Sequence, residues 1–287
     1  MAMRKLTALC VATLMCSPVS AQSYFSQLLI FGDSLLDSGN LGLRFTNRVG
    51  DGNGDFTVGD YANIAPQYLG TALGLPTDPA VSGGTNYAVG NDFLNGTAFD
   101  QASIVNSAQT LIAGVSAISA AGGRYIMLSN LPDLGNTAAA QAQNFVVPGS
   151  AAAISAGAAG YNQALMTFAN FSSANIIPVD LAGVITYIAA NAEDYGFANG
   201  ANIAFGPLGT FDQRYMCFDD CIQHPVFGID GVNPDPSKLL FNDGVHPTAK
   251  VGEITGDYLI DVVMAPQLVG RLSGIALGIA RTQHDSL

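Results

Sequence analysis

A helix followed by a short apolar strand occurs twice in this chain, and this pattern limits the fold more than any other feature. Residues 107–121 have the composition of a helix and lead through two glycines into the apolar run 124–128. The alanine-rich segment 151–171 is followed in the same way by the apolar run 175–179. Alternating helices and strands are typical of a parallel sheet with helices on both faces, because parallel strands need crossover connections. We therefore expect an α/β fold, arranged as a three-layer α/β/α sandwich with a parallel sheet.

A further strand and a further helix are expected nearer the N-terminus. Residues 26–31 end in an apolar run that stops at Gly32, so Ser34 comes just past the end of a strand. Between residues 61 and 73, apolar residues recur at helical spacing, and Gly74 follows as an end signal.

The apolar segment 262–280 raises the question of a membrane span. Pro266, Gln267 and Arg271 interrupt it, so no unbroken stretch of about 20 apolar residues remains. We expect an amphipathic helix and tail over residues 266–287, and no stable transmembrane span.

The N-terminal residues are typical of a secretory signal peptide. Two basic residues precede the apolar run 6–15, and small residues at 18–21 follow. Cleavage after Ala21 would leave one large domain over residues 22–265, followed by the C-terminal helix and tail. The signal peptide predicts an exported protein in the periplasm, outside the cell or at its surface.

The charge of the chain argues against nucleic acid as a partner. The net charge is -12, with 10 Lys and Arg against 22 Asp and Glu. Nucleic acid phosphates attract clustered basic side chains, whereas these are scattered, and two of them lie in the signal peptide. Binding to anionic membrane surfaces is disfavoured for the same reason.

The cysteines fit an exported chain. Cys10 and Cys16 would leave with the signal peptide, so that the mature chain keeps Cys217 and Cys221. These two form a candidate disulfide in an oxidising compartment, or remain free thiols. Zinc would need more ligands, and His224 is the only histidine near them.

A loop rich in Gly and Asp raises the question of calcium. Asp51, Asn53 and Asp55 begin like a calcium-binding loop. The match then fails, because Phe56 replaces the required Gly and Ala62 replaces the closing Glu. We expect a solvated loop here and no metal.

Three residue types in the chain suit nucleophilic acyl transfer. A serine nucleophile needs an imidazole that takes its proton and a carboxylate that orients the imidazole. Of the three histidines, His246 is the best candidate base, because His284 lies in the polar tail and His224 precedes a proline beside the cysteines. Asp243 lies three residues earlier, with a glycine between them that allows a tight turn. Ser34 is the candidate nucleophile.

Two motifs around these residues resemble those of a known family. The segment 31–35 reads Phe-Gly-Asp-Ser-Leu, and the segment 243–248 reads Asp-Gly-Val-His-Pro-Thr. Together they resemble the first and fifth sequence blocks of the GDSL family, also called SGNH hydrolases. The segments 45–49, 84–88 and 124–135 extend the resemblance and make it closest to the GDSL esterase domains of autotransporters.

The resemblance implies a flavodoxin-like α/β/α fold. It also implies Ser34 as the nucleophile, His246 as the base and Asp243 as the partner of that base. The α/β-hydrolase alternative is disfavoured, because the chain contains no GxSxG motif.

The family's oxyanion hole shows one departure in this chain. The resemblance implies three donors: the Ser34 backbone N–H, a Gly of the second block and an Asn of the third. Here the two blocks are fused, because residues 84–90 resemble the second block and residues 90–94 resemble the end of the third. Gly90 and Asn91 are the candidate donors, and the fusion would leave the sheet one strand short.

The function expected is carboxylic ester hydrolysis by an esterase or lipase. Ser34 would carry the acyl group as a covalent intermediate, no cofactor would be required, and the substrate would be a small-molecule or lipid ester. The alternative is a non-catalytic exported GDSL-like domain that lost its oxyanion hole through the fusion of the two blocks.

Overall fold

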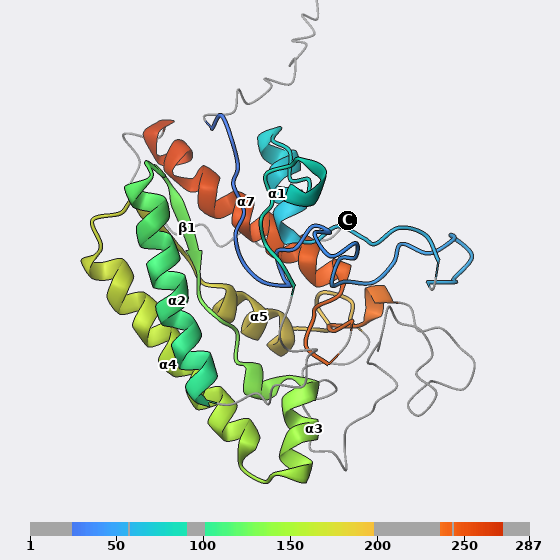
Figure 1. Ribbon diagram of the computed structural model, residues 1–287. Helices are drawn as coiled ribbons and strands as arrows, with labels where there is room; N and C mark the ends of the chain where they lie inside the picture. Colours follow the sequence, from blue (N-terminus) through green and yellow to red (C-terminus); the bar gives the residue numbers. More distant parts are fainter. Residues whose placement is uncertain (1–24, 57, 91–100, 198–235, 243, 272–287) are drawn as a thin grey trace, which may run out of the picture.

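The computed structural model describes residues 25–56, 58–90, 101–197, 236–242 and 244–271 (Figure 1). The α-helices are α1 (Ala65–Leu73), α2 (Gln101–Ala120), α3 (Ala138–Val146), α4 (Ser150–Phe171), α5 (Leu181–Ala190) and α7 (Ala249–Arg271). The strands are β1 (Ile126–Ser129) and β2 (Ile176–Val179), and short 3-10 helices are η1 (Ala80–Ser82), η2 (Leu134–Asn136) and η4 (Pro236–Lys238). The expected signal peptide (1–21) and the candidate disulfide residues Cys217 and Cys221 lie outside the described residues.

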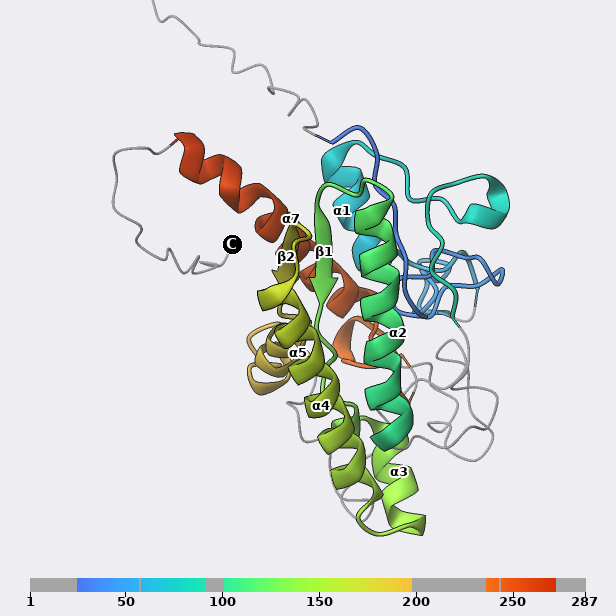
Figure 2. The ribbon, with the colours of Figure 1, turned by 60° about the vertical axis from the view of Figure 1, so that its left-hand side comes forward.

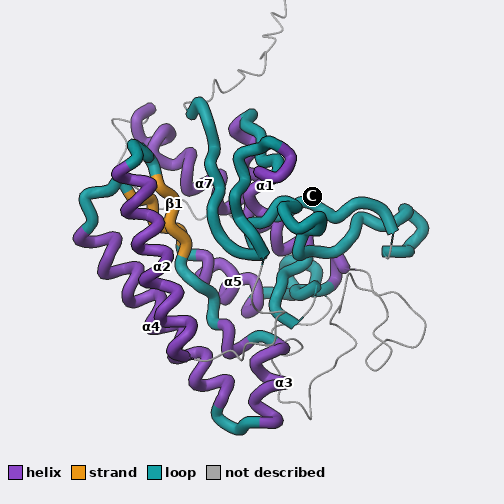
Figure 3. Tube along the Cα trace, in the orientation of Figure 1, coloured by secondary structure: helices purple, strands orange, loops and turns teal. Residues whose placement is uncertain are grey.

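The strands β1 and β2 pair in parallel, as the repeated helix-to-strand pattern predicts. Ile126 lies opposite Ile176 at one end of the pair, and Ser129 lies opposite Val179 at the other. The chain between the two strands passes through α3 and α4, so a helical crossover returns it to the end of the sheet at which β1 began. Figure 3 shows how much of the described chain is helix around this small sheet.

Side chains on the two faces of β1 separate the helices into two layers. Ile126 and Leu128 pack with Val115 of α2 and Leu165 of α4. Met127, which points to the opposite face, packs against a cluster that α1 and α7 share. Figures 1 and 2 show α2 and α4 side by side on one face, with α7 on the other. The three-layer α/β/α arrangement is therefore confirmed.

A second parallel pairing precedes this sheet in the sequence. The Ile30 N–H donates to the Thr85 carbonyl (3.1 Å), and the Tyr87 N–H donates to the Ile30 carbonyl (2.7 Å). The expected strand at 26–31 is thus reduced to a single bridge, between Ile30 and Asn86. Among the described residues, the regular sheet consists of β1 and β2 alone.

Helix boundaries differ from the expected ones where local signals decide them. The helix α1 begins at Ala65 rather than near 61, because Pro66 suits a first turn and the Gln67 side chain accepts the Ile64 N–H. It ends as expected at Gly74, whose φ of 66° is the left-handed conformation that glycine adopts without strain.

The helices α2 and α7 both begin earlier than expected. Of the helices described, only α2 is long and apolar enough to cross a membrane by length and composition, and it packs along α4. The helix α7 begins at Ala249 and continues without a break past position 265, where the domain was expected to end.

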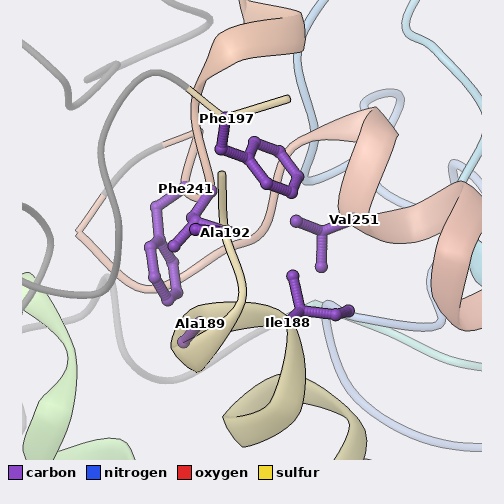
Figure 4. Close-up of a cluster of buried hydrophobic side chains, with 7 residues drawn as sticks. Ile188, Ala189, Ala192, Phe197, Phe241 and Val251 are labelled. Carbon is purple, nitrogen blue, oxygen red and sulfur yellow. The ribbon is translucent and has the colours of Figure 1, made fainter. Parts of the chain in front are cut away.

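A buried cluster beside α5 anchors the segment that precedes α7. Figure 4 shows its members converging from three parts of the chain: Ile188, Ala189, Ala192, Phe197, Phe241 and Val251. Because Phe241 and Val251 bracket residues 242–250, this cluster fixes both ends of the loop that carries His246.

Candidate active site

The structure brings Ser34 and His246 into direct contact. The Nε2 atom of His246 lies 2.7 Å from the Ser34 hydroxyl oxygen, although 212 positions separate the two residues in sequence. A hydrogen bond of this length is the geometry through which an imidazole can take a hydroxyl proton. The histidine is 7% exposed, whereas the serine is half-buried.

A tight turn after the first bridged segment presents the serine. The Asp33 carboxylate accepts the Leu35 N–H (3.0 Å), and the Asp33 carbonyl accepts the Leu36 N–H (3.1 Å). The Asn86 side chain donates to the Leu36 carbonyl (2.7 Å) and ties the turn to the neighbouring chain. Hydrogen bonds therefore fix the residues on both sides of Ser34 in the sequence.

The histidine lies on a hairpin that leads into α7. The Asn242 N–H donates to the His246 carbonyl (2.7 Å), and the Thr248 N–H donates to the Leu240 carbonyl (3.0 Å). The Gly244 carbonyl accepts the Ala139 N–H (3.0 Å) at the start of α3. Asp243, the expected orienting carboxylate, lies outside the described residues.

The segment 45–49 supports the histidine from a distant part of the sequence. The Phe45 ring lies 4.8 Å, centroid to centroid, from the His246 imidazole. The Asn47 side chain accepts the Ala249 N–H (2.8 Å) and so satisfies an N–H at the first turn of α7. The sequence marks this segment through its family resemblance, but the contact with His246 is visible only in the structure.

A buried carboxylate organises the backbone behind the serine. Asp37 is 0% exposed, and one of its oxygens accepts the N–H groups of Gly39 (2.9 Å) and Asn40 (2.7 Å). The other oxygen accepts the Gly90 N–H (2.8 Å). Nothing in the sequence around Asp37 marks it for this role, which depends on contacts across the chain.

Two of the three candidate oxyanion donors lie within the described residues. Ser34 and Gly90 are described, and Asn91 lies outside the described residues. Gly90 packs directly on the Phe45 ring, where a Cβ would overlap the ring atoms. Ser34, His246, Phe45 and Gly90 thus belong to one connected group of residues.

Tyr161 of α4 lies near the turn that carries the serine, and the pKa of its phenol is raised well above the usual value. Burial, together with the negative charge of Asp33, raises the pKa of the Tyr161 phenol to about 12. The residue packs with apolar side chains from α2 and β1. It remains neutral throughout the physiological pH range.

The described residues contain no cluster of side chains that could bind a metal ion. Within the described ranges, no group of three or more His, Cys, Asp or Glu side chains could hold a metal ion. The Asp51 carboxylate accepts the N–H groups of Asn53 and Asp55. Hydrogen bonds from Asn53 lower the pKa of this carboxyl group.

No family model matches the chain. The chain is 30% identical to Esterase EstA of Pseudomonas aeruginosa and, equally, to Esterase EstA of Pseudomonas putida. Each of these matches covers 100% of this chain and 54% of the relative. A third relative, described as an uncharacterized protein in the trpE-trpG intergenic region of Pseudomonas putida, is 29% identical over 93% of this chain and 53% of its own length.

The chain spans about half the length of the curated relatives it matches. The match to Esterase EstA extends over 373 positions, whereas this chain has 287 residues, so the relatives contain internal segments with no counterpart here. The chain that pairs Ser34 with His246 is therefore similar, over its whole length, to part of two proteins named as esterases.

Proposed function

We propose that this chain is a carboxylic ester hydrolase that acts through Ser34. The single observation that carries the proposal is the 2.7 Å contact between the Ser34 hydroxyl and His246 Nε2. Similarity to two proteins named Esterase EstA favours an ester as the substrate. The substrate class we propose is a small-molecule or lipid ester, handled without a cofactor.

The proposed reaction has two steps. The Ser34 oxygen attacks the ester carbonyl carbon while His246 takes the hydroxyl proton, and His246 then gives this proton to the departing alcohol. Water next attacks the Ser34 ester, His246 takes the proton of the water, and the acid leaves as Ser34 regains its hydroxyl proton. Asp243 is proposed to orient the imidazole and to stabilise its protonated form.

The proposed oxyanion hole consists of the Ser34 backbone N–H with Gly90 and Asn91. In the structure, the Gly90 N–H donates to Asp37, so it must exchange this acceptor for the oxyanion before it can contribute. Loss of one donor typically lowers turnover about 10² to 10³-fold. The hydrogen bond from the Gly90 N–H to Asp37 also favours the second candidate, a non-catalytic GDSL-like domain.

The finer classification is part of the same proposal. We assign the chain to the GDSL-type serine esterases and lipases, near the esterase domains of autotransporters, on the motifs at 31–35 and 243–248. Residues 1–21 are proposed as the signal peptide that exports it, and residues 22–265 as the hydrolase domain. The proposed location is the periplasm, the medium or the cell surface.

The test is hydrolysis of p-nitrophenyl esters by the chain lacking residues 1–21, beside a Ser34→Ala variant. We expect turnover that falls at least about 10⁴-fold in the variant, because removal of a nucleophile from a working triad has costs of this size or larger. Circular dichroism of both proteins checks that they are folded. Folded protein without Ser34-dependent turnover on any ester would support the non-catalytic candidate instead.

A further inference from the structure

A partly open cavity of about 130 Å³ is lined by residues that flank Ser34 and His246 in the sequence. Leu35 and Leu36, which directly follow Ser34, line it. Val245 and Pro247, on either side of His246, line it as well. One end of the cavity is thus bounded by the immediate neighbours of both residues of the proposed chemistry.

The cavity extends from there into the space between the layers. Ser129 and Val179, at the carboxyl ends of β1 and β2, are part of its wall. Gly252, Thr255 and Leu259 add one face of α7. Since a helix rises 1.5 Å per residue, Leu259 lies roughly 15 Å along α7 from its first residue, Ala249. The far end is therefore formed by side chains remote from His246.

The wall is mostly apolar, and its polar members are Asp133, Ser129 and four threonines. The hydroxyls of Thr137 and Thr248 donate to the backbone carbonyls of Leu134 and Leu239. Thr46 is 1% exposed, and its hydroxyl has no hydrogen-bond partner within the described residues. An apolar cavity next to a nucleophile suits a hydrocarbon group that remains attached to the nucleophile.

We infer that this cavity binds the acyl chain of the ester, and that it accepts chains of about six carbons; the inference rests on the proposed function of Ser34. The acyl group stays on Ser34 through both steps of the reaction, whereas the alcohol must leave after the first. A cavity that extends between the layers fits the retained group better than the departing one. An apolar cavity of roughly 150 Å³ holds benzene, which has six carbons, so the slightly smaller cavity here sets a similar limit.

The experiment measures binding separately from turnover. Isothermal titration of the Ser34→Ala variant with methyl acetate, butanoate, hexanoate and octanoate reports affinity for an ester that is not consumed. We expect affinity to rise about fourfold per added methylene up to about six carbons and then to stop rising. Affinity that does not depend on chain length would overturn the inference.

A second substitution places the chain in the cavity. Thr255→Phe, added to Ser34→Ala, fills the α7 side of the cavity and should move the best chain to about four carbons or fewer. Val263→Phe is the matched control, because Val263 is buried on the same helix but packs with Leu69 and Leu73 outside the cavity wall. An unchanged optimum in folded Thr255→Phe protein would contradict the assignment.

An isosteric substitution remains informative if Thr255→Phe does not fold. Thr46→Val replaces the unpartnered hydroxyl by a methyl group, so bound hydrocarbon no longer displaces water from a polar group. We expect hexanoate binding to tighten about fivefold. Weaker binding in Thr46→Val would show that the hydroxyl recognises a polar atom and would overturn a hydrocarbon occupant. Wild-type protein that binds the ester series but does not hydrolyse it would refute the proposed function and leave the cavity assignment standing.

Discussion

The Gly90 N–H donates a 2.8 Å hydrogen bond to the carboxylate of Asp37. This contact joins the segment behind the nucleophile to Gly90, where the two fused sequence blocks meet. The carboxylate is completely buried and also accepts the N–H groups of Gly39 and Asn40. It therefore organises three backbone donors, of which the buried Gly90 N–H would otherwise lack an acceptor in the interior.

Asp37→Asn should destabilise the protein by about 1–3 kcal/mol. The amide keeps one acceptor oxygen but replaces the other with a donor, so a buried N–H is left without an acceptor. Urea denaturation measures the free energy of unfolding. The control is Asp257→Asn, an exposed position on α7 that should change stability by no more than about 0.5 kcal/mol. Equal effects at the two positions would contradict the role assigned to Asp37.

Gly90→Ala should impair both stability and turnover. A Cβ at this position overlaps the Phe45 ring, which lies against the His246 imidazole, so the ring must move toward or away from the histidine. We expect a loss of about 1–3 kcal/mol in unfolding free energy and a lower kcat. Thermal unfolding and ester hydrolysis check the two parts.

The matched glycine is Gly114 in α2, where a Cβ meets nothing within 4 Å. Gly114→Ala should stabilise the protein by about 0.5–1 kcal/mol, because alanine has a higher helix propensity than glycine. Stabilisation by Gly90→Ala as well would mean that the contact between Gly90 and Phe45 is not close.

Asn47→Ala should loosen the start of α7. The side chain accepts the Ala249 N–H, and loss of a comparable helix-terminal acceptor costs about 0.5–2 kcal/mol. Because His246 lies three residues before Ala249, we also expect kcat to fall more than KM changes. Urea denaturation and steady-state kinetics test this. Asn63→Ala, which loses only an exposed 3.4 Å contact with Arg44, is the control.

Stability should fall in alkaline solution because of Tyr161. Burial first, and then the charge of Asp33, raises the pKa of its phenol from near 10 to about 12. Above pH 10 the unfolded chain releases this proton while the folded chain retains it, so stability declines as pH rises from about 10 to about 12. The decline attributable to Tyr161 is on the order of 2 kcal/mol.

Tyr161→Phe should remove this part of the pH dependence, measured by urea denaturation at pH 9 and pH 11. Tyr125→Phe, at an exposed position, is the control for loss of a phenol. A slope that is the same in wild-type and Tyr161→Phe protein would contradict the assignment.

The sequence predicts the layers of this fold because their signals are local. The glycines before residue 124 and the apolar runs place β1 and β2 within a few residues of their positions. The strand expected at 26–31 is harder to predict, because its pairing depends on a partner that sequence periodicity does not identify. Its single bridge to Asn86 depends on a segment more than fifty residues away.

The site divides in the same way. Ser34 and His246 stand in distinctive motifs, and the structure places their side chains 2.7 Å apart. Asp37, Phe45 and Asn47 have no distinctive chemistry in sequence, and their importance comes from contacts across the chain. Asp243, Asn91 and the disulfide candidates Cys217 and Cys221 remain predictions.

The separation of 212 positions between Ser34 and His246 has a consequence for how this protein matures. Closing a loop of this length has an entropic cost that the contact alone does not offset, so we expect the pair to form after the elements that hold its two ends. A partly folded chain therefore holds a serine without its base. If Ser34 acts as proposed, hydrolytic activity appears only at the end of folding, and its recovery during refolding times the last step of assembly.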